Sequence, residues 1–204
     1  APPAQMAGLT PVIVAGTRHS LILTSNLSLY GFGYSSYGQL GIDSYSNYNP
    51  MEILPSGVTG MAAGDNHSLF IKHDGSLWAM GYNYYGQLGD GSTTTRYSPV
   101  QIVASGVVSV TAGDYHSLFI KSDGSLWAMG NNSYGRLGDG STTKRTSPVK
   151  VVDSGVVSLA AGYSHSLFIK SDGSLWAMGR NYEGQLGDGS TSSRNSPVKV
   201  VDSG

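Results

Sequence analysis

The chain has 204 residues, a formal net charge of −1 and a charged fraction of 12%, which is about half that of an ordinary soluble domain. It has no long basic or acidic run, so bulk electrostatics do not attract it to nucleic acid or to anionic lipid. The absence of cysteine excludes disulfides and thiolate chemistry, and no apolar run is long enough for membrane insertion.

A repeat of about 49 residues organises the sequence. The histidines of a recurring A-G-x-x-H-S motif lie 48, 49 and 49 residues apart, and the glycine of a recurring L-G pair follows the same steps. We therefore expect one repeat domain over residues 1–204, with an N-terminal extension, 1–7, followed by four units: 8–56, 57–105, 106–154 and 155–204.

The third unit shows the predicted elements in chain order. Residues 107–113 are a β-branched run that ends at glycine, which predicts a first strand. Residues 116–122 alternate in polarity, with Leu118 and Ile120 on one face and Phe119 on the other, which predicts a second strand with two distinct faces.

A hairpin is predicted next. Asp123 and Gly124 predict a two-residue type I′ turn, in which both central residues need positive φ. Residues 125–130 form the return strand, with Leu126 on one face and Trp127 on the other. We interpret the stretch 112–130, which recurs in the other units, as the two inner strands and the hairpin of one structural unit.

A polar loop rich in glycine, asparagine and serine follows, and Pro148 opens the last strand, 148–152, where a missing N–H is tolerated. Each unit thus has four short strands and no helical periodicity. This pattern predicts an all-β fold, a β-propeller built from four-stranded antiparallel blades. A single sheet of this kind cannot bury both faces, so we expect the units to depend on their neighbours.

The motifs shared by the units resemble those of a known family. The pattern A-G-x-x-H-S, D-G-x-L-W-x-x-G, N-x-x-G-Q-L-G and P-V resembles the regulator of chromosome condensation repeat, in its bacterial type. The resemblance covers all four units and is specific in units two to four, whereas unit one has Tyr30 in place of the Trp and Ser25-Asn26 in place of Asp-Gly. It implies a β-propeller, usually of seven blades. Four units leave four alternatives open: a small ring, a paired larger ring, a piece of a longer array, or an open assembly.

The recurring histidines and tryptophans each allow two interpretations. Histidines around an axis could ligate a metal, but we favour buried rings that join blade to blade, as the resemblance also implies. The tryptophans could stack on sugars, but we expect them to fill the space between blades. These residues are therefore predicted to be structural: His19, His67, His116, His165, Trp78, Trp127 and Trp176.

No chemical centre stands out in the sequence. The Gly-Asp-Gly-Ser-Thr loops only faintly resemble a calcium loop or a phosphate cradle, and turn chemistry explains them. The carboxylates of Asp74, Asp123 and Asp172 belong to hairpin turns. We predict no catalytic residue, no metal and no cofactor, and we expect that the protein is not an enzyme. A pair of carboxylates assembled across blades stays the alternative.

Near-identical units share the residues that the fold requires, so positions that differ between them are available for another function. They gather in the loop after A-G, in the loop after the return strand, and behind Gly-Asp-Gly-Ser-Thr, as at Thr95-Arg96-Tyr97. Tyrosine, asparagine and arginine on scaffolded loops are typical of protein-recognition surfaces, although neutral drift is the alternative. The predicted binding residues are Arg18, Tyr34, Tyr37, Asp65, Asn66, Tyr82, Tyr84, Tyr85, Asp114, Tyr115, Tyr134, Tyr163, Arg180, Tyr182 and Glu183.

The sequence thus predicts a non-enzymatic scaffold that binds a protein partner through these loops. A first alternative is a structural subunit that assembles with copies of itself into an extracellular ring, fibre or matrix. A second is a protein inhibitor of a secreted enzyme, for which the family offers a bacterial precedent. Low charge with many Tyr, Asn, Ser and Thr residues favours a bacterial protein that is secreted or lies on the cell surface.

Overall fold

The computed structural model describes residues 11–42 and 45–202. They form four antiparallel sheets of four strands each, which we call blades 1 to 4. The predicted N-terminal extension, 1–7, lies outside the described residues. Within these residues, no helix has the length and apolarity needed to span a membrane.

The strands of the blades follow chain order. Blade 1 contains β1 (Val12–Ala15), β2 (His19–Leu23), β3 (Leu29–Tyr34) and β4 (Ser46–Leu54). Blade 2 contains β5 (Val58–Ala63), β6 (His67–Lys72), β7 (Leu77–Gly81) and β8 (Arg96–Val103). Blade 3 contains β9 (Val107–Ala112), β10 (His116–Lys121), β11 (Leu126–Gly130) and β12 (Arg145–Val152). Blade 4 contains β13 (Val156–Ala161), β14 (His165–Lys170), β15 (Leu175–Gly179) and β16 (Arg194–Val201).

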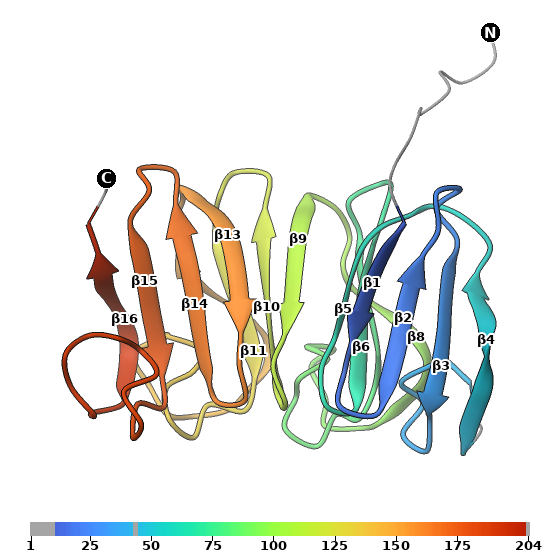
Figure 1. Ribbon diagram of the computed structural model, residues 1–204, viewed down its shortest axis with the longest axis horizontal. Helices are drawn as coiled ribbons and strands as arrows, with labels where there is room; N and C mark the ends of the chain where they lie inside the picture. Colours follow the sequence, from blue (N-terminus) through green and yellow to red (C-terminus); the bar gives the residue numbers. More distant parts are fainter. Residues whose placement is uncertain (1–10, 43–44, 203–204) are drawn as a thin grey trace, which may run out of the picture.

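The blades stand side by side in chain order, with blade 1 and blade 4 at opposite ends of the row (Figure 1). The first strand of each blade is the innermost, because β5 contacts β1 and β9, and β9 contacts β13. One hollow of about 320 Å³ is lined by the ends of all four innermost strands. The row therefore curves around an axis as a propeller does, and its two ends stay apart.

The hairpin between the two middle strands differs from the predicted turn. Gly124 has φ +76°, but Asp123 is not among the described residues with positive φ, so the turn is not type I′. Gly124 N–H donates to the Lys121 carbonyl at 2.8 Å, and Lys121 N–H donates to the Ser125 carbonyl at 3.0 Å. The loop is thus three residues long, with Gly124 in the left-handed position, because the Asp123 carboxylate accepts the Ser125 N–H at 2.9 Å and holds the turn.

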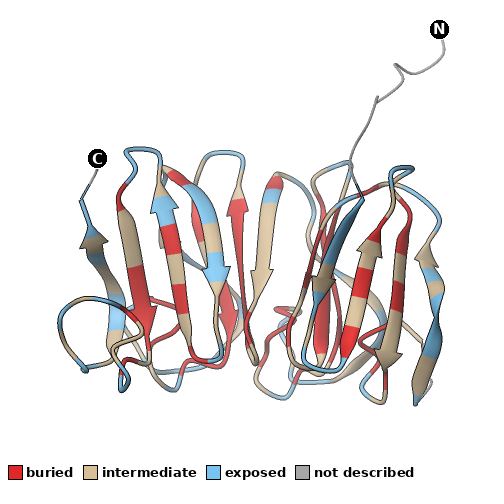
Figure 2. Ribbon diagram, in the orientation of Figure 1, coloured by how far each residue is buried: buried red, intermediate tan, exposed pale blue. Residues whose placement is uncertain are grey.

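Neighbouring blades join through two different apolar faces. Leu69, Ile71 and Leu77 of blade 2 pack in one cluster with Phe119 and Met129 of blade 3. The alternation predicted along the second strand is therefore confirmed: its Leu and Ile face one neighbour and its Phe faces the other. The same two faces meet between blades 1 and 2 and between blades 3 and 4, which makes the middle strands the most buried part of the row (Figure 2).

The tryptophans lie on the Phe side of these interfaces. Trp78, Trp127 and Trp176 are each partly buried against the cluster at the junction with the preceding blade. Each ring stacks on the phenylalanine opposite it, as Trp127 does on Phe119 with centroids 6.2 Å apart, and the indole N–H of Trp127 donates to Ser125 at 2.9 Å. Trp127 thus contributes apolar area to the junction between blades 2 and 3.

Three of the histidines link one blade to the next. The Nε2 atoms of His19, His67 and His116 lie 2.8, 2.9 and 2.9 Å from the hydroxyl oxygens of Ser68, Ser117 and Ser166. The Ser117 hydroxyl donates its only proton to the Gln87 carbonyl, at 2.8 Å, so the His67 ring must donate from Nε2–H. Each link is therefore a neutral imidazole that bonds a serine of the following blade. The part of the chain that the structure describes contains no group of three potential metal ligands.

A glycine before each histidine makes room for its ring. A Cβ placed on Gly113 would lie 2.2 Å from Cε1 of His116 and 2.4 Å from the Gly162 carbonyl oxygen. Any larger residue would displace either the ring or the backbone of the next blade. This contact explains why the motif reads A-G-x-x-H, with the glycine three residues ahead of the histidine.

Candidate functional site

The variable residues of every blade lie in two loops at the same end of the row. In an antiparallel blade, the loop between the first and second strands and the loop between the third and fourth strands must emerge at one end. The Asp-Gly hairpins emerge at the other. Figure 1 shows the long loop from β15 to β16 at the lower end and the β14–β15 hairpin at the upper end. The sequence-predicted binding residues are thus brought to one end of the molecule.

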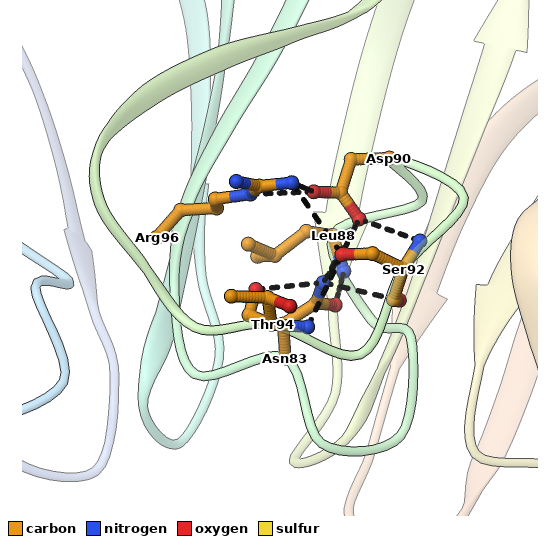
Figure 3. A network of polar contacts seen from close by, with 6 residues as sticks. All are labelled: Asn83, Leu88, Asp90, Ser92, Thr94 and Arg96. Carbon is orange, nitrogen blue, oxygen red and sulfur yellow. Dashed lines mark hydrogen bonds and ion pairs between the residues drawn. The ribbon is translucent and has the colours of Figure 1, made fainter.

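The long loops are held by a polar network, shown for blade 2 in Figure 3. The amide of Asn83 donates to Asp90, at 3.0 Å, and to the carbonyls of Ser92 and Thr94. The Asp90 carboxylate also accepts from the Ser92 N–H at 3.0 Å and from Arg96 Nε at 2.6 Å. The partners of this carboxylate lie in its own loop or, for Arg96, at the first residue of β8, which explains the Gly-Asp-Gly-Ser-Thr segment as loop structure.

This network corrects one sequence interpretation. Arg96 was grouped with the variable positions behind Gly-Asp-Gly-Ser-Thr, but it pairs with the buried Asp90. The same ion pair joins Arg145 to Asp139 and Arg194 to Asp188, each at 2.6 Å. The pKa of Asp188 is lowered to about 2, mainly by the hydrogen bond from Arg194 and next by the hydrogen bond from Ser190. These arginines serve the fold, and only the residues on either side of them vary.

A continuous set of tyrosine rings covers the loop end of blades 1 and 2. Tyr37 and Tyr82 lie with ring centroids 4.9 Å apart, Tyr82 and Tyr85 lie 6.5 Å apart, and Tyr85 and Tyr115 lie 5.1 Å apart. Tyr84 packs edge-on against Tyr85 at 5.1 Å. The series therefore runs from blade 1 across blade 2 to the first loop of blade 3.

The same end continues onto blades 3 and 4, where Tyr134 and Tyr182 lie 5.7 Å apart. We call the whole set the tyrosine surface; it consists of Tyr34, Tyr37, Tyr45, Tyr82, Tyr84, Tyr85, Tyr115, Tyr134, Tyr163 and Tyr182. Tyr45 was missed in the sequence, because unit one departs from the repeat there; its ring lies 5.5 Å from Tyr34.

Several rings of the tyrosine surface are both exposed and supported. Tyr84, Tyr163 and Tyr182 are 60%, 61% and 58% exposed. Cations lie over some of them: Arg180 is 5.2 Å from the Tyr182 centroid, and Lys144 is 5.6 Å from that of Tyr84. Arg18 lies over Tyr34 in the same way, at 5.6 Å. Such contacts hold aromatic side chains in place while one face stays open.

The predicted acidic residues occupy two places. Asp65 and Asp114 line the hollow on the axis, and Asn66 donates to Asp65 at 2.6 Å. Burial, and then the charge of Asp65, raises the pKa of Asp114 to about 6. Glu183 lies instead on the outside of blade 4, where it accepts from Arg180 at 2.7 Å.

The most informative residue missed by the sequence interpretation is Arg136. It follows a glycine at a position where the other units have Gln39, Gln87 and Gln185. This departure from the repeat was the available signal. Arg136 is only 3% exposed, and burial lowers the pKa of its guanidinium.

Comparison with known proteins now decides the family. A family model described as the RCC1-like domain matches residues 3–203. This chain belongs to the RCC1-like domain family. The RCC1-like match and the four-stranded blades confirm both the resemblance and the propeller fold predicted from the sequence. No curated protein sequence matches the chain.

Solved structures show the same RCC1-like fold. Human WBSCR16 is 24% identical with a TM-score of 0.82, and the match covers 93% of this chain and 52% of that one. Yeast RCC1 (Prp20) bound to Kap60 is 21% identical with a TM-score of 0.83, covering 94% of this chain and 48% of that one. Prp20p from Saccharomyces cerevisiae is 22% identical with a TM-score of 0.79, covering 94% and 50%. The RCC1-like chain described here thus spans about half the length of these structures.

Proposed function

We propose that this RCC1-like chain is a scaffold that binds a protein partner through the tyrosine surface. The observation that carries the proposal is the series of rings from Tyr37 to Tyr115 across blades 1 to 3, together with the Tyr134–Tyr182 pair on blades 3 and 4. Tyrosine supplies large contact area with few rotatable bonds, so little entropy is lost when it is held against a partner. A protein of the same fold occurs in a protein complex, since yeast RCC1 (Prp20) is seen bound to Kap60. Fold likeness alone does not bring that partner to this chain.

Replacing Tyr84 and Tyr182 together with alanine tests the proposal. Each is mostly exposed, so the fold is expected to remain. Interface tyrosines of this kind contribute about 2 kcal/mol or more, so the affinity for a partner is expected to fall at least about 30-fold. The measurement compares proteins retained by the immobilised wild type and by the variant, and then their dissociation constants.

Tyr48→Ala is the matched control, because Tyr48 is 89% exposed on the outermost strand β4. It is expected to retain every partner of the wild type. If the double variant kept the same partners at the same affinity, protein binding through this surface would be wrong.

A second candidate is self-assembly, and the two ends of the row favour it. Ile71 and Ile120 are 3% and 2% exposed under the following blade, whereas the equivalent Ile169 of blade 4 is 39% exposed. At the other end, Ile22 and Phe32 stand where blade 2 has the fully buried Phe70 and Met80.

The histidine–serine hydrogen bond between blades also lacks one partner at each end of the row. His165 is half-buried and has no following blade, while Ser20 of blade 1 holds the position that Ser68 holds in blade 2. Blade 4 of one copy therefore carries the face that receives blade 1 of the next copy. Repeating that contact gives a closed ring if the rotation closes and a filament if it does not.

Ile169→Asp tests this candidate, because it places a charge in the proposed junction. Light scattering of the wild type is expected to give a multiple of the 21.3 kDa chain mass, and the variant is expected to fall to one chain. Val108→Asp, at a 60% exposed position on β9 of the internal blade 3, is expected to keep the wild-type mass. A wild type that stays at one chain at millimolar concentration would contradict self-assembly.

Inhibition of a secreted enzyme would be one form of the first proposal, in which the partner held by the tyrosine surface is an enzyme. The retention experiment covers it, because an inhibited enzyme would be among the retained proteins. The low charge and polar composition continue to favour a secreted or cell-surface location in bacteria, which stays a prediction.

A further inference from the structure

A buried arginine at the junction of blades 3 and 4 lacks a carboxylate partner among the described residues. Arg136 donates from Nη1 to the Tyr163 carbonyl at 3.2 Å, and its guanidinium lies 5.6 Å from the Tyr134 ring. Its Nε is buried and has no hydrogen-bond partner within the part of the chain that the structure describes. A buried, incompletely bonded cation is costly, so the fold alone does not explain this residue.

Arg136 lines a cavity of about 380 Å³. The lining residues include Tyr85, Tyr134 and Tyr163, together with Ser164 and Arg180. Ser164 is 2% exposed, and its hydroxyl, like Nε of Arg180, has no partner among the described residues. Three buried donor groups without partners among the described residues therefore belong to residues that line one cavity.

The repeat shows that these groups are not part of the architecture. Arg136 replaces a glutamine that the other three units share, and Arg180 stands where the other units have Tyr34, Tyr82 and Asn131. Both arginines occur at one junction only. The junctions between blades 1 and 2 and between blades 2 and 3 are built without them.

We propose that this cavity binds a carboxylate, supplied by an acidic residue of the protein partner that the tyrosine surface holds. The proposal rests on the proposed function and names the chemistry of one contact within it. The free Nε–H of Arg136 and the Ser164 hydroxyl supply donors of the kind that a carboxylate accepts. The tyrosine walls enclose the methylene groups of an Asp or Glu side chain.

The charges around the cavity select a monoanion over a phosphate or sulfate dianion. Arg180 already pairs with Glu183 at 2.7 Å. The carboxylate of Asp114, on the loop between β9 and β10, lies close enough to interact with Arg136. The positive charge left unpaired is therefore small, and it matches one carboxylate better than a doubly charged group.

The test titrates the purified chain with two capped peptides, Gly-Glu-Gly and Gly-Gln-Gly, and follows the Arg side-chain N–H signals by NMR. The Glu peptide is expected to shift the Arg136 Nε–H signal and to saturate, whereas the Gln peptide is not. Arg136→Gln restores the residue that the other units carry, so it is expected to fold and to weaken the Glu peptide at least about tenfold. No shift with the Glu peptide, equal shifts with both peptides, or unchanged affinity in Arg136→Gln would overturn the proposal.

Inorganic phosphate and sulfate form the second arm. Both are expected to shift the same signal more weakly than the Glu peptide at equal concentration, and a stronger response to either would overturn the choice of a carboxylate. The peptide assay needs no natural partner, so it separates the two proposals. Suppose that the peptide binds at Arg136 while the Tyr84 and Tyr182 double variant keeps its partners. That result would support the carboxylate site in the cavity and refute the proposed function of the tyrosine surface.

Discussion

His67→Ala is expected to lower the free energy of unfolding by about 3 kcal/mol. The substitution removes the bond from Nε2–H to Ser117 and leaves that hydroxyl, fully buried, without its donor. It also leaves a hole beside Gly64, whose missing Cβ is what makes space for the ring. A lost buried hydrogen bond costs about 1–3 kcal/mol, and the cavity adds to it. Urea unfolding at pH 8 measures the loss.

The chain supplies its own matched control for that experiment. His165 holds the same place in blade 4, but it is half-buried and has no serine of a following blade to bond. His165→Ala is expected to cost less than about 1 kcal/mol, as a substitution outside the buried junctions does. Equal losses in the two variants would contradict the account of the histidine as a link between blades.

Acidification is expected to destabilise the chain strongly between pH 6.5 and 4. Burial lowers the pKa of His19 to about 4 and that of His67 to about 3, and it holds the pKa of His116 well below its ordinary value. These rings stay neutral in the folded chain, while the unfolded chain binds protons below about pH 6.5. Stability is therefore complete above pH 6.5 and falls as the pH falls toward the folded pKa values.

The magnitude follows from the number of rings. At pH 5 each of the three histidines costs about 2 kcal/mol relative to pH 8, or about 6 kcal/mol together, with uptake of about three protons on unfolding. Asp114, with its pKa raised to about 6, acts in the opposite sense because it gains a proton more readily when folded, but it is one partly buried group against three histidine rings and offsets only part of the loss. Urea midpoints at pH 8, 6.5 and 5 measure the effect, and a flat profile would show that the rings can charge in place.

Most of the fold could be predicted from the sequence repeat. The alternation of Leu118, Phe119 and Ile120 was enough to assign the two faces of a blade, because a strand has a strict two-residue period. The antiparallel strand order of the structure places the variable loops at one end. The type I′ turn was wrong because Asp-Gly is compatible with loops of two or three residues. The Asp123 carboxylate, which bonds Ser125, favours the longer one.

The site was less accessible to sequence reasoning, for physical reasons. Arg96 was placed among variable residues because its neighbours vary, and only the Asp90 contact shows that it holds the loop. Arg136 looked like an ordinary loop residue, since burial and a missing partner depend on the neighbouring blade. Which tyrosines touch one another likewise depends on the angle between blades, which no local pattern contains.

The proposed function places a protein partner on the tyrosine surface. A photo-reactive phenylalanine analogue placed at position 84 tests this directly in extracts of the source organism, with the same analogue at position 157 near the opposite end of β13 as the reference. A distinct cross-linked protein is expected from position 84 and not from position 157, and it is expected to be lost when Tyr182 is also changed to alanine. Cross-linking of the same proteins from both positions, or from position 157 alone, would contradict the proposed function.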